Sequence, residues 1–244
     1  MKDLLPSPSA NTHFFAYELP PIADYVQAMA AVWYNRRFSA PGGHVSRLRQ
    51  LGKATDQYYL FHFHDDTLVN LMPELQEQPG TLFLWNQPPL IERLDAGDQS
   101  HPLAPGSFSA DRVAGPPQAL RLATLVQAPE AGQGWASLAY TVTVPPGSTL
   151  RFAALKDAGG LAEEDGMAFR VRIQKPSGEL EQVFATFLQP DLPGMASGWR
   201  EVSVPLEAYW DQTILVRLEV SAGANSSHDL GYWSNPRLVR DTPY

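Results

Sequence analysis

Apolar and polar residues alternate along most of the second half of the chain. The alternation is clearest in five runs: Leu138, Tyr140, Val142 and Val144; Leu150 and Phe152; Phe169, Val171 and Ile173; Val202, Val204 and Leu206; Ile214, Val216, Leu218 and Val220. A period of two is typical of strands that bury one face. Turn-forming residues at 145–147 (PPG) and 176–178 (PSG) separate neighbouring runs. We therefore predict an all-β sandwich over residues 106–244.

The first half has a different texture, in which helical and extended patterns follow one another. Residues 22–34 are rich in alanine and place Ile22, Val26, Met29 and Trp33 at helical spacing. A short helix is predicted at 45–51 and another at 67–78, where Asp65 or Asp66 is the expected cap.

Two extended segments accompany these helices, an aromatic run at 58–64 and the run TLFLW at 81–85. Strand, helix and strand in this order predict a small α/β unit over residues 1–105, with turn-rich residues 86–105 as its connection to the sandwich. The expected fold class of the whole chain is thus α+β.

Charge and composition exclude several classes of function. The formal charge is −8, and 26 acidic residues face 18 basic ones without a basic run, so nucleic acid is not an expected partner. The absence of cysteine excludes disulfides, thiolate nucleophiles and zinc–thiolate sites. Residues 1–10 carry no apolar secretory core, and no run of about 18 apolar residues occurs, so we expect no membrane insertion.

Several short motifs of the second half follow a familiar order. Gly134-Trp135 precedes the first clear strand, EDGM at 164–167 leads into FRVRI, GWREV spans 198–202, and DLGYWSNPRL at 229–238 closes the domain. This order resembles the galactose-binding-like jelly-roll sandwich, similar to carbohydrate-binding modules of bacterial glycoside hydrolases, including the NPCBM type. The resemblance covers about residues 106–240 and implies glycan binding at end loops or on a concave sheet, and a structural calcium ion.

The resemblance also assigns roles to two residues of the closing motif. Asp229 matches an acidic residue that is at least partly structural in relatives, and we retain it as a candidate metal ligand. Trp233 matches a tryptophan that packs near the strand ends. Neither match identifies a sugar.

Aromatic side chains are the natural sugar platforms, because their faces stack on the C–H side of pyranose rings while polar neighbours bind the hydroxyls. Trp210 is the leading candidate because it lies in a turn (EAYWDQ), where strand packing explains a tryptophan less easily. The other candidates are Trp199, Tyr209 and Tyr232, with the polar neighbours Asp211, Asn225 and His228.

A second constellation lies in the first half, at His62, His64 and Asp66. Alternate residues of a strand share a face, so the two imidazoles could bind one metal ion. The pattern H-x-H-x-D resembles the start of the metallo-β-lactamase-like site, but Thr67 stands where the next histidine belongs. A third feature, the acidic run 163–165, is either a solvated loop, a calcium-binding loop or a pair of catalytic carboxylates.

The leading hypothesis is a non-catalytic carbohydrate-binding or accessory module that acts outside the cytoplasm, with a glycan or a carbohydrate-active protein as its partner. One alternative is enzymatic: a metal-dependent hydrolase that uses the His62, His64 and Asp66 cluster. Another is a soluble domain of a membrane glycosyltransferase, because the first half weakly resembles soluble regions of bacterial polytopic glycosyltransferases. The third alternative is a structural assembly protein without a small ligand.

Overall fold

The computed structural model describes residues 12–17, 57–64, 67–70, 80–103, 106–116, 119–157, 165–189, 198–224 and 229–240. The chain divides into two compact units, Met1–Glu77 and Gln78–Tyr244. In the first unit the described residues form a three-stranded sheet in the order β1-β2-β3, with the bounds β1 Thr12–Tyr17, β2 Gln57–His64 and β3 Thr67–Asn70.

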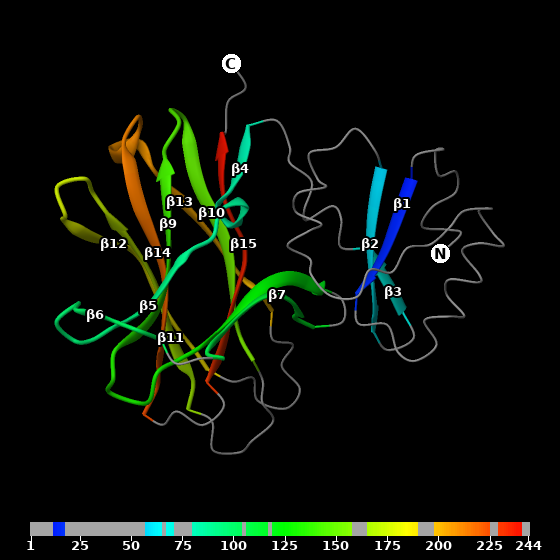
Figure 1. Cartoon of the computed structure of the whole chain (residues 1–244), viewed down its shortest axis with the longest axis horizontal. Helices are drawn as coiled ribbons and strands as arrows, with labels where there is room; N and C mark the ends of the chain where they lie inside the picture. The colour runs from blue at the N-terminus through cyan, green and yellow to red at the C-terminus, as the bar shows by residue number, and fades with distance from the viewer. Residues whose placement is uncertain are drawn as a thin grey trace. The chain divides into compact units, whose positions relative to one another are not determined.

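The second unit is a β-sandwich of two sheets, as the alternating pattern predicts (Figure 1). Its elements are β4 Thr81–Phe83, η2 Leu84–Asn86, β5 Leu90–Leu94, β6 Ser100–His101, β7 Phe108–Ala114, β8 Arg121–Gln127, β9 Trp135–Thr143, β10 Ser148–Lys156, β11 Met167–Gln174, β12 Leu180–Leu188, β13 Arg200–Pro205, η4 Glu207–Tyr209, β14 Thr213–Ala222 and β15 Leu230–Arg240. One sheet has the order β13-β10-β15-β8-β7 with β4 added to β15, and the other has the order β12-β11-β14-β9-β5-β6.

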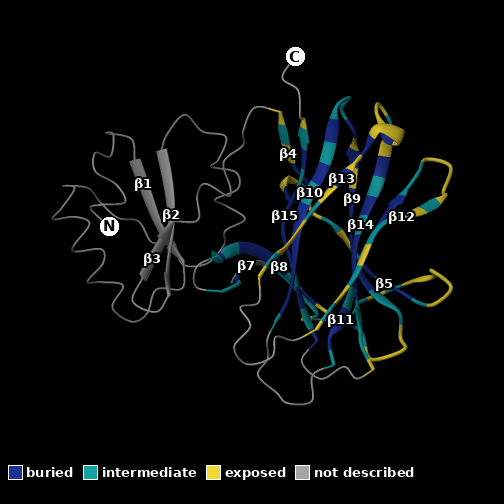
Figure 2. Cartoon of the chain, turned by 180° about the vertical axis from the view of Figure 1, so that it is seen from behind, coloured by how far each residue is buried: buried dark blue, intermediate teal, exposed yellow. Residues whose placement is uncertain are grey.

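The core lies between the two sheets and is built from the inward residues of the predicted runs. Phe169, Val171 and Ile173 of β11 are fully buried, and they pack with inward residues of β9, β10 and β14. Trp233, the tryptophan of the closing motif, is also fully buried, and its ring meets those of Phe152 and Phe169 edge to face. Figure 2 shows the buried residues along the central strands and exposed residues in the turns.

Three short strands that precede residue 106, in the segment assigned to the first unit and its connection, belong to the sandwich. The run TLFLW forms β4, which pairs with β15 and then continues as the 3-10 turn η2. The segment expected to be a connection contains β5 and β6, and β5 pairs with β9. The strand β5 has only five residues, LIERL, and lies between Pro88-Pro89 and the polar turn at 95–99. The turn-forming residues on both sides made the whole segment resemble a loop in the sequence.

The first unit differs from its prediction at one described element. The strand expected at 58–64 is confirmed as β2, but residues 67–70 form β3 and not the start of a helix. Leu68 and Val69 pair with Phe63 and His62, so this β-branched, apolar segment completes a hairpin. The helices predicted at 22–34 and 45–51, and the rest of the one predicted at 67–78, lie outside the described residues.

Candidate functional site

The outward side of the sheet β12-β11-β14-β9-β5-β6 carries a network of charged side chains. We name it the charged face and define it by Arg170, Arg172, Arg217, Glu219 and Glu92. Because successive residues of a strand point to opposite sides, the residues of β11 and β14 occupy the positions between buried core residues, and Glu92 follows Ile91, which packs against the core.

The register of the sheet places the charged face in rows across the strands. In one row Arg170 pairs with Glu219, Glu219 with Ser137, and Ser137 with Glu92. In the next row Arg172 pairs with Arg217. Residues directly opposite in an antiparallel sheet have Cβ atoms about 5 Å apart, so long side chains of both rows meet.

Glu219 is the centre of this network. Its side chain is fully buried and accepts hydrogen bonds from Arg170 Nε at 2.5 Å and from Arg172 Nε at 2.9 Å on one oxygen. The other oxygen accepts from Arg172 Nη2 at 2.9 Å, which makes the Arg172 contact bidentate. Desolvation lowers the pKa of Arg170, whereas the carboxylates of Glu219 and Asp98 outweigh desolvation and raise the pKa of Arg172.

Glu92 forms the second ion pair of the face. Its Oε1 accepts a short hydrogen bond from Arg217 Nη1, and its Oε2 accepts one from the hydroxyl of Ser100 at 2.5 Å. Arg217 Nη2 also donates to the side-chain oxygen of Gln174 at 3.1 Å. Side-chain hydrogen bonds of Ser100, Glu92, Arg217 and Gln174 thus link strands β6, β5, β14 and β11, and Glu92, like Glu219, is almost fully buried.

Two aromatic rings border the charged rows. The Arg170 guanidinium carbon lies 3.8 Å from the centre of the Trp135 ring. On β12, Phe187 is half-exposed and pairs with Ala168, which in turn pairs with Ser221. Trp135 and Phe187 therefore occupy strands β9 and β12 of the same face, separated by three strand spacings of about 4.8 Å each.

The turn between β5 and β6, residues 95–99, is mostly exposed (Figure 2), and its Asp98 contacts Arg172 of the charged face. Asp95 organises it: its Oδ1 accepts from the backbone N–H groups of Gly97 and Gln99, and its Oδ2 lies 2.9 Å from His101 Nε2. The His101 contact and the two backbone bonds lower the pKa of Asp95 below its usual value of 3.8. Asp98, with a φ of 61°, places its Oδ1 2.7 Å from Arg172 Nη1.

The aromatic residues predicted from the sequence as sugar platforms do not form one site in the structure. Tyr209 is 3% exposed and belongs to the core, where burial and the nearby Glu181 carboxylate raise its pKa. Trp210 follows η4 and is 39% exposed, and Asp211 beside it adopts a left-handed φ of 60°. Trp210 and Asp211 are therefore accessible to a ligand, whereas Tyr209 is not.

Trp199 and Tyr232 lie together, but on the other sheet. Both pack on a small apolar cluster of Ala114, Ala123 and Leu155. The Trp199 indole donates to the backbone oxygen of Ala119 at 2.7 Å, which anchors the ring to the protein. Burial, with the Asp157 carboxylate as a second cause, raises the pKa of Tyr232 to about 12. These two rings contribute to packing, and Trp210 does not belong to the cluster on which they pack.

Asp229, the candidate metal ligand of the closing motif, already faces a cation. Its carboxylate lies 3.9 Å from the Lys156 ammonium, and both side chains are buried. Lys156 also donates to the backbone oxygen of Asp157 at 3.2 Å. The position thus contains an internal ion pair.

The other candidate ligands cannot be placed as a site. His62 and His64 lie two residues apart in β2, but their side chains are outside the described part of the chain. The same holds for the remaining candidates, Asp66, Asn225, His228 and residues 163–164. Asp165, the last acid of its run, accepts a short hydrogen bond from the Ala224 N–H. Among the described residues no cluster of three or more His, Cys, Asp or Glu could hold a metal ion.

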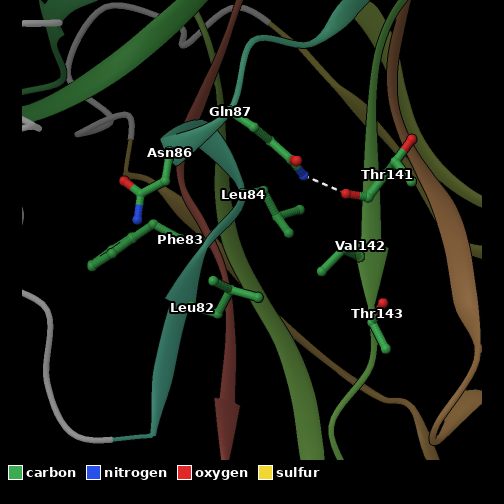
Figure 3. A pocket seen from close by; sticks show the side chains of 8 residues that line it. All are labelled: Leu82, Phe83, Leu84, Asn86, Gln87, Thr141, Val142 and Thr143. Carbon is green, nitrogen blue, oxygen red and sulfur yellow. Dashed lines mark hydrogen bonds between the residues drawn. The ribbon is translucent and has the colours of Figure 1, made fainter.

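A separate pocket of about 400 Å³ lies between β4–η2 and the last residues of β9 (Figure 3). Its lining residues are Leu82, Phe83, Leu84, Asn86, Gln87, Thr141, Val142 and Thr143. The Gln87 amide donates to the Thr141 carbonyl across the pocket, and the Thr143 hydroxyl bonds that of Thr213. Because these polar groups are already engaged and the rest is mainly apolar, the pocket is less suited to a hydroxylated ligand than the charged face.

Comparison with known proteins gives similarity to solved structures only. No family model matches the chain, and no curated protein matches it. One similar structure is CBM51 from Clostridium perfringens GH95 in complex with methyl-galactose, with 12% identity, a TM-score of 0.41, and coverage of 65% of this chain and 99% of that chain. A second is Caldicellulosiruptor saccharolyticus CBM27-1 in complex with mannohexaose, with 11% identity, a TM-score of 0.40, and coverage of 64% and 98%.

A third similar structure is a cleaved adhesin domain of Lys-gingipain from Porphyromonas gingivalis, with 13% identity, a TM-score of 0.41, and coverage of 66% of this chain and 98% of that chain. Carbohydrate-binding modules thus occur among the similar structures. The resemblance to polytopic glycosyltransferases has no support from these matches. Within the described residues, no helix has the length and apolar character needed to cross a membrane.

The charged face was missed as a site by sequence reasoning. Arg170, Arg172, Arg217 and Glu219 are visible in the sequence as the polar members of alternating runs. The alternating runs do not reveal how the strands are aligned with one another. It is this register that places Glu219 beside both arginines of β11. Charged residues of both signs at the outward positions of several strands are the signal that could have indicated a face with a role.

Proposed function

We propose that the chain is a non-catalytic saccharide-binding module that acts outside the cytoplasm and binds its ligand on the charged face. The observation that supports this most directly is the combination of Trp135 and the half-exposed Phe187 with an ordered row of polar groups on one sheet face. Sugars require both components, apolar faces for their C–H groups and directed hydrogen bonds for their hydroxyls.

The polar groups of this face are pre-ordered. Arg170 is held by Glu219 and the Trp135 ring, and Arg217 by Glu92 and Gln174, so the positions of these guanidinium groups are set before a ligand arrives. A rigid site loses less conformational entropy when it binds, which increases affinity for a given set of contacts. An extended glycan lying across β9, β14, β11 and β12 would meet both rings.

The ligands in the similar structures, methyl-galactose and mannohexaose, belong to those proteins, and the proposal for this chain does not depend on them. The exposed Trp210 with Asp211 is the second candidate platform, retained because its ring is accessible in a turn. The partner on either surface is a glycan, presented alone or on a carbohydrate-active protein.

For the first unit we propose the α/β arrangement expected from its sequence. Strands β1 and β2 pair in parallel, from Thr12 opposite Gln57 to Tyr17 opposite His62. Parallel neighbours need a crossover connection, usually an α-helix, and the helical pattern at 22–34 lies between these two strands. The metal-dependent hydrolase with His62, His64 and Asp66 stays an alternative prediction for this unit.

The test of the proposed function is a glycan array probed with the wild-type chain and with Trp135→Ala, Phe187→Ala and Leu82→Ala. Leu82 is a matched control because it is an exposed apolar residue of β4, in the other sheet. We expect binding by the wild type and Leu82→Ala, and weakened binding by the two aromatic variants. Wild-type binding to no glycan at all would refute the proposal.

A further inference from the structure

One carboxylate of the charged network differs from the others in its attachment. Arg170, Arg172 and Arg217 are balanced by Glu92, Glu219 and Asp98. Glu219 is fully buried and Glu92 is 7% exposed, and both project from strands. The Asp98 side chain is 41% exposed and projects from the turn between β5 and β6. Asp98 is therefore the member of this set that can leave without disturbing the sheet.

The arginines beneath Asp98 are well placed for a carboxylate. Arg172 is 7% exposed, uses Nε and Nη2 on Glu219, and directs Nη1 to Asp98 Oδ1 at 2.7 Å. Arg170 Nη2 is buried, makes no hydrogen bond within the described part of the chain, and lies 3.7 Å from the same oxygen. Donors of two guanidinium groups thus converge on the position of one exposed oxygen.

From this arrangement we infer that the charged face selects carboxylated sugars, and that Asp98 occupies the anion position while the site is free. The inference rests on the proposed function and specifies its ligand class. A sugar carboxylate that displaces Asp98 restores the same balance of charge, so Arg170 and Arg172 keep two carboxylates between them. A neutral sugar that displaces Asp98 leaves these two cations with the single carboxylate of Glu219, which costs free energy.

The turn can release Asp98 at low cost. Residues 96–99 are exposed. The Asp98 backbone N–H donates to the Asp95 carbonyl oxygen at 3.0 Å, and the Asp95 side chain bonds Gly97, Gln99 and His101, so none of these bonds involves the Asp98 carboxylate. The net charge of −8 opposes a polyanion at long range, so the preference depends on short-range contacts with the arginines and not on the overall field.

The test compares matched ligands by calorimetric titration: trigalacturonic acid against its methyl ester, and sialyllactose against lactose. The two pairs distinguish uronic acids from sialic acids as the source of the carboxylate. We expect at least one acidic member to bind about tenfold more tightly than its neutral counterpart, or about 1.4 kcal/mol. Equal affinity within both pairs overturns the inference while leaving saccharide binding intact.

Two variants identify the group responsible. Asp98→Asn removes the internal carboxylate, and asparagine tolerates the left-handed backbone found there. We expect it to bind both the acidic and the neutral ligand several-fold more tightly than the wild type, because neither has to displace a carboxylate from Arg172. Arg172→Lys keeps the charge but loses the forked geometry, and should lose the acidic preference. An unchanged acidic preference in Arg172→Lys, or an unchanged affinity for the acidic ligand in Asp98→Asn, overturns the inference, as does binding of no ligand, which also refutes the proposed function.

Discussion

The guanidinium carbon of Arg170 lies 3.8 Å from the centre of the Trp135 ring, so the two side chains stack across strands β11 and β9. The same arginine donates to Glu219 at 2.5 Å. Arg170 thereby links an aromatic ring to the buried carboxylate at the centre of the charged face. This arrangement connects the stability of the sheet with the surface that we propose for saccharide binding.

Glu219→Gln should destabilise the sandwich strongly. The substitution removes the charge that balances Arg170 and Arg172, two guanidinium groups in a mostly buried network. Breaking one side of a buried ion pair costs about 3–5 kcal/mol. Urea denaturation followed by circular dichroism measures the loss in the free energy of unfolding.

The matched control is Glu201→Gln, which breaks the ion pair with Arg121 at 2.5 Å. The Glu201 side chain is 61% exposed, so we expect a loss of about 0–1 kcal/mol. Equal effects of the two substitutions would contradict the central place of Glu219 in the network.

Gly134→Ala should be far more destabilising than Gly132→Ala. Both glycines have a positive φ, 98° and 78°, so both substitutions carry a strain of about 1 kcal/mol. A Cβ on Gly134 would also lie 2.0 Å from the Leu94 carbonyl oxygen, whereas one on Gly132 would meet nothing within 4 Å. We expect a loss of at least about 3 kcal/mol for Gly134→Ala alone, measured by thermal unfolding. Similar losses would show that β5 does not approach Gly134 this closely.

Acid should loosen the turn at 95–99 before the sandwich unfolds. The pKa of Asp95 is lower in the folded chain than its usual value of 3.8, so its contribution to stability is present above that value and is lost as the pH falls through the folded pKa. Hydrogen exchange at Gly97 and Gln99 should therefore accelerate, relative to intrinsic rates, below about pH 4.

Asp95→Asn provides the comparison, because the variant lacks this titration. Its Gly97 and Gln99 amides should exchange faster than those of the wild type at neutral pH, without the acid-dependent step. A step of the same size in the variant would exclude Asp95 as its cause.

Lys156→Met should be rescued in part by Asp229→Asn. The single substitution leaves the buried Asp229 carboxylate without the ammonium 3.9 Å away, at a cost of about 3–5 kcal/mol. The double variant removes both charges, so its loss should be smaller than the sum of the single losses in a double-mutant cycle. Additive losses would indicate that the two charges do not interact.

The sandwich could be predicted because the patterns that indicate its strands and turns lie in short, continuous segments of the sequence. Phe169, Val171 and Ile173 alternate with arginines, and the turn at Pro176-Ser177-Gly178 follows, where Gly178 has a φ of 89°. The short strand β5 was not recognised in the sequence. Its five residues form a strand because they pair with β9, about 45 residues further along the chain. β3 was assigned to a helix because a local pattern contains no information on the β2 hairpin.

The site was less predictable than the fold for the same reason. Trp210 was selected as a turn residue and is indeed exposed, whereas Tyr209 beside it is buried. Trp135, Arg170, Glu219 and Phe187 come from four strands and meet only through register and strand order. No spacing in the sequence contains that arrangement.

The measurement that tests the central claim most directly is an NMR titration of the wild-type chain with the glycan that binds best on the array. We expect the ligand to shift the Trp135 indole N–H and Arg170 Nε–H resonances and to leave the Trp210 indole unchanged. Shifts at Trp210 without any at Trp135 and Arg170 would contradict saccharide binding on the charged face.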